Sequence, residues 1–310
     1  MSNPPRQRAP RNRTLTVTPG EEAALEASIT TLAELEQGTG WHNRIVNADV
    51  MDCLDLIPDG LFPLIIIDPP YNLNKDFHGH KFTAMRTDRY EEYLRSWLHK
   101  VCDKLSSTGT LYICGDWKCS SSLQRVVEER LTVVNRITWQ REKGRGARSN
   151  WKNSMEDIWM AVNNPKQYCF NVDDVKLRRK VIAPYRDAGK PKDWEENAQG
   201  RFRLTYPSNF WDDISVPFWS MPENTDHPTQ KPEKLYAKLV LASSNPGDLI
   251  FDPFMGSGTA AVVAKKLGRE YFGVEINRDY CLWAAKRLAL ASVNPAIQGY
   301  EDGLFRERNS

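Results

Sequence analysis

The four residues Leu64-Ile65-Ile66-Ile67 constrain the fold more than any other feature, because every one of them is apolar. A strand with one face in water alternates polar and apolar side chains, whereas a strand covered on both faces is apolar throughout. The run is far too short to cross a bilayer. The sequence therefore predicts a central parallel strand between two layers of helices.

Short β-rich runs alternate with helical stretches from Arg44 onward. In the clearest helical stretch, residues 89–105, the large apolar side chains fall on one face. Such alternation predicts an α/β fold with a doubly wound, seven-stranded, mostly parallel sheet. Strands are expected at 44–48, 64–68, 110–114, 133–139, 158–162, 249–252 and 271–275, and helices at 21–37, 89–105, 232–243, 257–267 and 278–291.

The composition is that of a folded protein with one basic region. The 310 residues are 40% hydrophobic, which is enough for a sizeable core, and the net charge is only +2. Between Arg136 and Arg203, however, 16 Lys and Arg stand against 9 Asp and Glu. A basic segment on a near-neutral body is typical of a protein that binds a polyanion, although it can equally be a solvated surface.

The N-terminus and the cysteines indicate neither secretion nor a metal site. Residues 1–19 are rich in Pro, Arg and Asn, are expected to be disordered, and hold no apolar stretch typical of a signal peptide. The six cysteines are scattered without a Cys-x-x-Cys pair, so we expect reduced thiols and no metal. These features favour a cytoplasmic protein without membrane spans.

Residues 163–226 interrupt the alternation with a long insert rich in charged, proline and aromatic residues. A loop of this length is usually functional or a small subdomain. Basic and aromatic side chains together suit a surface that faces nucleic acid, since rings stack on bases. The alternative is a satellite core beneath a loop, which would account for some of the aromatic residues.

A glycine-rich turn, residues 251–259, follows a strand and begins a helix. Its spacing is neither that of a phosphate loop nor that of a dinucleotide fingerprint, so an anionic group such as a carboxylate remains as a ligand. Glu275 ends the next strand, where an acid can hold the two hydroxyls of a ribose. The pattern indicates a nucleoside-bearing cofactor; the alternative is an ordinary turn and a surface glutamate.

The turn Asp68-Pro69-Pro70-Tyr71 comes directly off the most buried strand. Prolines have no N–H, so the carbonyls beside them are left to accept hydrogen bonds from another group. A carboxylate, a carbonyl and an aromatic ring at the carboxyl end of a strand can receive a planar group that bears an NH₂. The alternative is a tight structural turn.

Together these segments resemble the β-class amino-methyltransferases of DNA, from about Arg44 to Ala291. Asp68–Tyr71 is similar to the family's catalytic motif and residues 251–259 to its cofactor motif. Residues 273–276 resemble its ribose-binding strand, and residues 227–232 and 151–159 resemble two further blocks. The catalytic motif precedes the cofactor motif, as in the circularly permuted β-class order. The resemblance implies a Rossmann-like methyltransferase sheet in which the strand at 158–162 is antiparallel.

The resemblance also implies the site residues and S-adenosyl-L-methionine as cofactor. The catalytic residues would be Asp68, Pro69, Pro70 and Tyr71. The cofactor-binding residues would be Asp49, Asp68, His227, Pro228, Thr229, Gln230, Lys231, Asp252, Pro253, Phe254, Gly256, Ser257, Gly258, Thr259, Glu275 and Ile276. The basic residues expected to contact DNA are Arg145, Arg148, Lys152, Arg178 and Arg179.

The expected activity is methylation of the exocyclic N6 of a flipped-out adenine in double-stranded DNA. An N4-cytosine methyltransferase is the nearest alternative, since that sister class usually has Ser in place of Asp68. A methyltransferase for protein amide nitrogens, whose turn usually begins with Asn, and a DNA-binding protein with a vestigial cofactor pocket are further alternatives. The expected partners are DNA, a restriction endonuclease that forms no stable complex with the chain, and a second copy in a homodimer.

The expected organisation has five segments. Residues 1–40 form an arm and helix, 41–162 the catalytic half, 163–226 a target-recognition insert, 227–295 the cofactor-binding half and 296–310 a tail.

Overall fold

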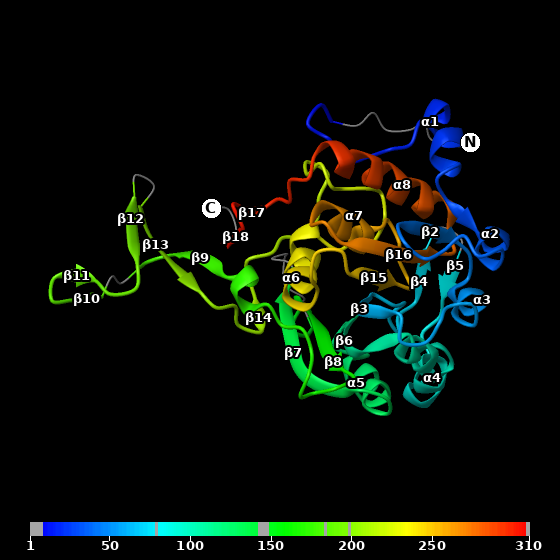
Figure 1. Ribbon diagram of the computed structural model, residues 1–310, viewed down its shortest axis with the longest axis horizontal. Coiled ribbons are helices and arrows are strands. Elements are labelled where there is room, and N and C mark those ends of the chain that lie inside the picture. Colours follow the sequence, from blue (N-terminus) through cyan, green and yellow to red (C-terminus); the bar gives the residue numbers. More distant parts are fainter. Residues whose placement is uncertain (1–8, 78–79, 142–148, 183–184, 198–199, 308–310) are drawn as a thin grey trace.

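The computed structural model describes residues 9–77, 80–141, 149–182, 185–197 and 200–307. Its main element is a nine-stranded sheet in the order β1-β2-β16-β15-β3-β6-β8-β7-β14 (Figure 1). The strands are β1 (Thr30–Thr31), β2 (Arg44–Asn47), β3 (Phe62–Ile67), β6 (Leu105–Gly115), β7 (Thr132–Gln140), β8 (Met155–Val162), β14 (Phe210–Trp211), β15 (Leu249–Asp252) and β16 (Glu270–Glu275).

All seven expected strands lie in this sheet, but the expected count of seven is wrong, because β1 and β14 add two short edge strands. Both were missed because two residues are too few to show a hydrophobic period. β8 runs antiparallel to both of its neighbours, as expected, and the other pairs are parallel.

Strand β3 lies in the middle of the sheet, and its side chains divide between two cores. Leu64 and Ile66 pack into the cluster beneath α6, α7 and α8, and Ile65 and Ile67 into the cluster beneath α3, α4 and α5. All four side chains are fully buried, which is why the strand is apolar throughout. The helices are α3 (Val50–Leu54), α4 (Thr87–Asp103), α5 (Ser120–Glu128), α6 (Glu233–Ser243), α7 (Thr259–Lys266) and α8 (Arg278–Val293).

Two helices replace the single helix expected at 21–37. α1 (Pro19–Glu26) and α2 (Leu32–Glu36) are separated by a turn and by β1. Thr31 starts α2 as its N-cap and forms a capping box with Glu34, so the chain begins a new helix there. The short helices α3 and α5 were not expected.

Residues 9–18, expected to be disordered, pack against the body of the protein. The backbone N–H of Arg13 donates to the Trp219 carbonyl at 2.6 Å, and that of Leu15 donates to the Asn224 carbonyl at 2.8 Å. Leu15 is buried. Residues 9–18 therefore pack against residues 219–224, which precede His227, and stabilise them.

Strands β9, β12 and β13 of the insert and the C-terminal strands β17 and β18 form a second, five-stranded sheet in the order β12-β13-β9-β18-β17. β12 and β13 project away from the body (Figure 1). The C-terminal residues do not form a separate tail, because β18 pairs in parallel with β9 and the Phe305 side chain is fully buried. The remaining elements are β4 (Lys75–Phe77), β5 (His80–Phe82), η1 (Val172–Val175), β9 (Leu177–Lys180), β10 (Arg186–Asp187), β11 (Lys190–Pro191), β12 (Glu195–Asn197), β13 (Gly200–Thr205), β17 (Tyr300–Glu301) and β18 (Leu304–Arg306).

Within these described ranges, no helix has both the length and the apolar character needed to cross a membrane.

Candidate active site

A cavity of about 420 Å³ opens beyond the carboxyl ends of the neighbouring strands β3, β15 and β16. Chain connections leave β3 and β15 in opposite directions across the sheet, and ligands of open α/β sheets bind at such switch points. Sixteen of the expected site residues line it: Asp49, Asp68, Pro69, Pro70, Tyr71, His227, Thr229, Gln230, Lys231, Pro253, Phe254, Gly256, Ser257, Thr259, Glu275 and Ile276.

Three of the expected cofactor-binding residues do not line this cavity. Pro228 lines a neighbouring cavity of about 180 Å³. Gly258 is the N-cap of α7 and packs against Ala284, where a Cβ would come within 2.6 Å of the alanine Cβ. Asp252 is buried at the end of β15, and its carboxylate accepts the Phe254 N–H at 3.1 Å. Burial raises the pKa of Asp252 well above its usual range. Asp252 and Gly258 therefore stabilise the glycine-rich turn without facing the cavity.

The glycine-rich turn lies close to the segment that carries His227. Gly256 has φ +53°, and a Cβ built there would lie 2.9 Å from His227 Nε2. A larger residue would therefore be both strained and obstructed. The two segments are also linked by the Ser257 hydroxyl, which donates to Gln230 Oε1 at 3.2 Å. The Thr259 hydroxyl donates to the Lys231 carbonyl at 3.1 Å.

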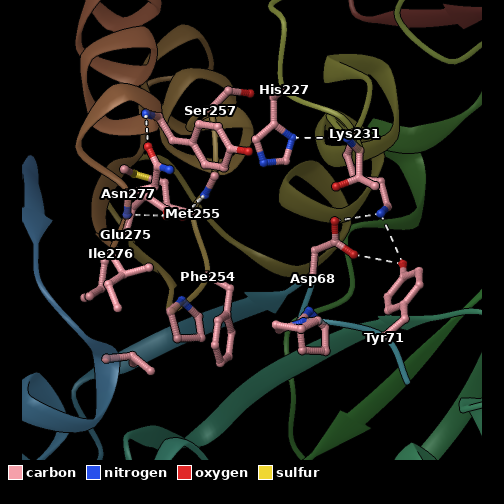
Figure 2. Close-up of a pocket in the computed structure, with 18 of the residues that line it drawn as sticks. Asp68, Tyr71, His227, Lys231, Phe254, Met255, Ser257, Glu275, Ile276 and Asn277 are labelled. Atoms are coloured by element: carbon pink, nitrogen blue, oxygen red, sulfur yellow. Dashed lines mark hydrogen bonds and ion pairs between the residues drawn. The ribbon is translucent and has the colours of Figure 1, made fainter. Parts of the chain in front are cut away.

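Glu275 ends β16 with its carboxylate fixed by the backbone. One oxygen accepts the Gly256 N–H and the other accepts the Asn277 N–H, both at 2.8 Å. Burial raises the pKa of Glu275 despite these hydrogen bonds. Figure 2 shows Glu275 beside Met255 and Ile276, at the end of the cavity opposite Asp68. A fixed carboxylate there can accept hydrogen bonds from a pair of hydroxyl groups.

An apolar rim adjoins Glu275. Phe254 extends into the cavity and meets Trp97 edge to face, with ring centroids 4.8 Å apart. Asp49 caps α3 by accepting the Met51 N–H at 2.9 Å, and it lines the same region. The Phe254 ring, the aliphatic side chain of Ile276 and the Asp49 carboxylate together form a site suited to binding an aromatic base.

At the other end of the cavity, the Asp68 carboxylate is held by two donors (Figure 2). The Tyr71 hydroxyl donates to Oδ1 at 2.8 Å, and the Lys231 ammonium donates to Oδ2 at 2.6 Å. The Tyr90 hydroxyl donates to the Pro70 carbonyl at 3.3 Å, which anchors the turn to α4.

Glu156 on β8 completes this cluster and was missed as a site residue. Its carboxylate lies 3.2 Å from the Lys231 ammonium and 2.8 Å from the Arg141 guanidinium. The side chain is only 2% exposed, and burying a charge is costly unless it is paired. The available signal in the sequence was an acidic residue on a strand that is otherwise largely apolar. The sequence does not show that Glu156 lies beside Asp68, because that contact depends on the order of the strands in the sheet.

The charges of the cluster affect each other's protonation. Burial alone would lower the pKa of Lys231, but the carboxylates of Asp68 and Glu156 outweigh it and raise that pKa above its usual value. Burial, aided by the same two charges, raises the pKa of Tyr71 well above its usual range. Lys231 is therefore a buried cation and Tyr71 a neutral donor.

None of the described residues expected to contact DNA lines either cavity. Two others, Arg145 and Arg148, are not among the residues that the structure describes. Lys152 precedes β8, and Arg178 and Arg179 lie on β9 in the insert. The Arg178 guanidinium stacks 4.1 Å from the centroid of Phe202 on β13.

Comparison with known proteins decides the family. A model described as a DNA methylase, covering N6 and N4 methyltransferases, matches residues 62–286. The chain belongs to the DNA methylase family. This methylase is 34% identical over 247 residues to the type II methyltransferase M.HpaI of Haemophilus parainfluenzae, covering 79% of the chain and 74% of the relative. It is 33% identical over 253 residues to the DNA adenine methyltransferase YhdJ of Escherichia coli K12, covering 80% and 83%.

A solved structure shares the fold of this methylase. The complex of M1.HpyAVI with S-adenosylmethionine matches it with a TM-score of 0.55 at 23% identity, over 79% of this chain and 98% of that one. The family match and the two relatives show that this methylase is an enzyme that transfers methyl groups to DNA, and the large cavity is its candidate active site.

Proposed function

We propose that this methylase transfers a methyl group from S-adenosyl-L-methionine to N6 of an adenine in duplex DNA. The observation that carries the proposal is the position of the Asp68 carboxylate, in the same cavity as the fixed Glu275 carboxylate and at its opposite end. Within the family we place the chain among the adenine methyltransferases of restriction–modification systems such as RsrI, which its motifs resemble.

The residues present fit the cofactor. Pockets that bury a small ligand have volumes of roughly 300–1,000 Å³, and this cavity of about 420 Å³ falls within that range. Glu275 would accept the ribose hydroxyls, and Phe254, Ile276 and Asp49 would enclose the adenine. The N-terminus of α7, together with residues 227–230, would receive the methionine end. Bound S-adenosylmethionine supplies an electrophilic methyl group.

The chain's part in the reaction is to orient a poor nucleophile. The lone pair of an exocyclic amine is delocalised into the base, so the nitrogen must become more tetrahedral before it can react. Asp68 and the Pro69 carbonyl would accept its two N–H groups and stabilise the positive charge that develops there. Tyr71 would stack on the base, and the rigid proline turn would hold the amine in line with the methyl group.

N4 of cytosine is an amine of the same kind, and the family covers both chemistries. Asp68 favours adenine, because the cytosine class usually has Ser at this position.

The proposal extends to the biological context. Residues 163–226 would recognise the target sequence, between a catalytic half at 41–162 and a cofactor-binding half at 227–295. Methylation would protect host DNA in a bacterial cytoplasm, close to the nucleoid, from a cognate endonuclease. The endonuclease would form no stable complex with the methylase, and a second copy of the methylase would complete a homodimer.

The test is to incubate the protein with unmethylated plasmid and tritiated cofactor, then to hydrolyse the DNA to nucleosides. Label in N6-methyl-2′-deoxyadenosine supports the proposal, label in N4-methyl-2′-deoxycytidine selects the alternative, and unlabelled DNA contradicts both. Modification-sensitive sequencing of the same plasmid identifies the target sequence. Plasmid already methylated by the enzyme is the matched control and should take up no label.

A further inference from the structure

Lys231 lies where a substrate amine would have to bind. Its ammonium is 2.6 Å from Asp68 Oδ2, 3.1 Å from the Tyr71 hydroxyl and 3.2 Å from Glu156 Oε2. An ammonium and an exocyclic amine are both N–H donors, so the lysine makes with Asp68 the hydrogen bond that the proposed substrate needs.

We propose that Lys231 is a positioning residue: it holds Asp68 in the substrate-free enzyme and moves to Glu156 when the target amine arrives. The inference rests on the proposed function. Lys231, which the sequence suggested as a cofactor-binding residue, would instead act at the binding site of the target amine. Glu156 would be the second carboxylate that pairs with the Lys231 ammonium.

The lysine has to leave Asp68 because of the charge that the reaction creates. The amine nitrogen gains a bond to the methyl carbon, the methyl–sulfur bond breaks and its electron pair stays on sulfur, and the nitrogen then loses one proton to Asp68 or to water. Positive charge therefore passes onto the nitrogen, which Asp68 stabilises only while its own charge is free to do so. An ammonium 2.6 Å away neutralises that carboxylate.

Glu156 is placed to receive the displaced cation. Removing one partner of a buried ion pair leaves a costly unpaired charge, so a lysine that is 5% exposed needs a carboxylate in both states. One oxygen of Glu156 already faces Lys231, and Arg141 holds the other.

There is space on the side of Glu156. Lys231 lines both cavities, whereas Glu156 lines only the smaller one, of about 180 Å³. The lysine can therefore turn from the large cavity toward Glu156 while the hydrogen bond between Asp68 and Tyr71 stays in place.

The test compares Glu156→Gln with the double variant Glu156→Gln/Lys231→Met in the full chain. In the single variant Lys231 has only Asp68 to bind, so turnover should fall about 100-fold, the scale of losing one charge-stabilising group. The double variant, which also lacks the lysine, should turn over at least about tenfold faster than Glu156→Gln. Asp157→Asn, the neighbouring carboxylate on β8, is the control matched in burial, because it accepts hydrogen bonds from Ser120 at 2.7 Å and Thr138 at 3.0 Å and lines neither cavity. Turnover per folded molecule should stay within about threefold, since no charge at the reacting amine is lost.

A binding measurement without cofactor gives a second readout. Duplexes carrying the mapped target are compared with duplexes that have purine, which lacks the amino group, at the target position. In both duplexes the target base stands opposite an abasic site, so that the two do not differ in base pairing. The wild type should prefer adenine, Glu156→Gln should lose this preference, and the double variant should regain it. Lys231→Met alone should strengthen the preference for adenine over purine. If Glu156→Gln does not fold, the comparison of Lys231→Met with the wild type tests the proposal.

The proposal is overturned if the double variant is no faster than Glu156→Gln, or if Lys231→Met weakens the preference for adenine. Failure of the proposed function appears differently, as an absence of methyl transfer by the wild type measured in the same series.

Discussion

The backbone N–H of Gly256 donates a 2.8 Å hydrogen bond to the carboxylate of Glu275, which joins the glycine-rich turn after β15 to the end of β16. The two residues are adjacent because β15 and β16 pair in parallel along their whole common length. One end of the cavity is therefore built from backbone geometry before any ligand binds.

Glu275→Ala should weaken binding of S-adenosylmethionine by about 1.5–3 kcal/mol, because hydrogen bonds to a charged group are removed. Isothermal titration of the purified protein measures the affinity. Asp279→Asn, an exposed acid in the first turn of α8, is the control and should change the affinity little. Unchanged affinity in Glu275→Ala would place the ribose acid elsewhere.

Gly256→Ala should impair cofactor binding, and Gly247→Ala should not. Both glycines have positive φ, so each substitution should cost about 1–2 kcal/mol of stability. Only at position 256 does the new Cβ meet a neighbour, 2.9 Å from His227 Nε2 at the cavity. Thermal unfolding and cofactor titration separate the two effects; equal cofactor affinities in the two variants would argue against a tight turn at Gly256.

Much of this arrangement could be predicted from the sequence, for local reasons. Buried strands such as β3 and β15 are apolar runs bounded by turns, and the Asp68 and glycine-rich turns follow them directly. The break between α1 and α2 was also visible as the capping box of Thr31 and Glu34, but the hydrophobic spacing across it suggested one helix.

Contacts between distant parts of the chain could not be predicted in this way. Lys231 and Asp68 are 163 residues apart, and Tyr71 and Glu156 are 85 residues apart. Their meeting depends on strand order, which the local pattern does not specify. The same holds for β18, whose pairing with β9 turns an expected tail into part of the insert sheet.

The target base should leave the duplex before it reacts, because N6 inside a helix cannot reach a cavity at the end of a buried strand. A mismatch opposite the target lowers the cost of unstacking, which is a few kcal/mol, so binding should tighten when the adenine is mispaired. Fluorescence of 2-aminopurine at the target should also rise on binding, more so in Tyr71→Ala, where stacking no longer quenches it. Equal affinity for paired and mispaired targets, together with a dark probe in Tyr71→Ala, would rule out flipping.

DNA affinity should depend steeply on salt if the basic insert contacts phosphates. The double variant Arg178→Ala/Arg179→Ala on β9 should reduce the slope of log affinity against log salt by about two, because each arginine would neutralise one phosphate. Arg95→Ala is the control, because Arg95 lies on α4, outside the insert, and pairs with Glu129 at 2.7 Å. Its replacement should leave the slope unchanged. A slope near zero in the wild type would contradict the assignment of this segment to DNA.

The measurement that tests the central claim most directly is methyl transfer by Asp68→Ala beside the wild type, with the modified nucleoside identified in each. Loss of one well-placed charge-stabilising group commonly costs about 10²–10³ in rate, so the variant should form N6-methyl-2′-deoxyadenosine that much more slowly. Titration should show that its cofactor affinity is largely intact. Near-normal turnover by Asp68→Ala, or a methylated nucleoside other than N6-methyl-2′-deoxyadenosine from the wild type, would contradict the account.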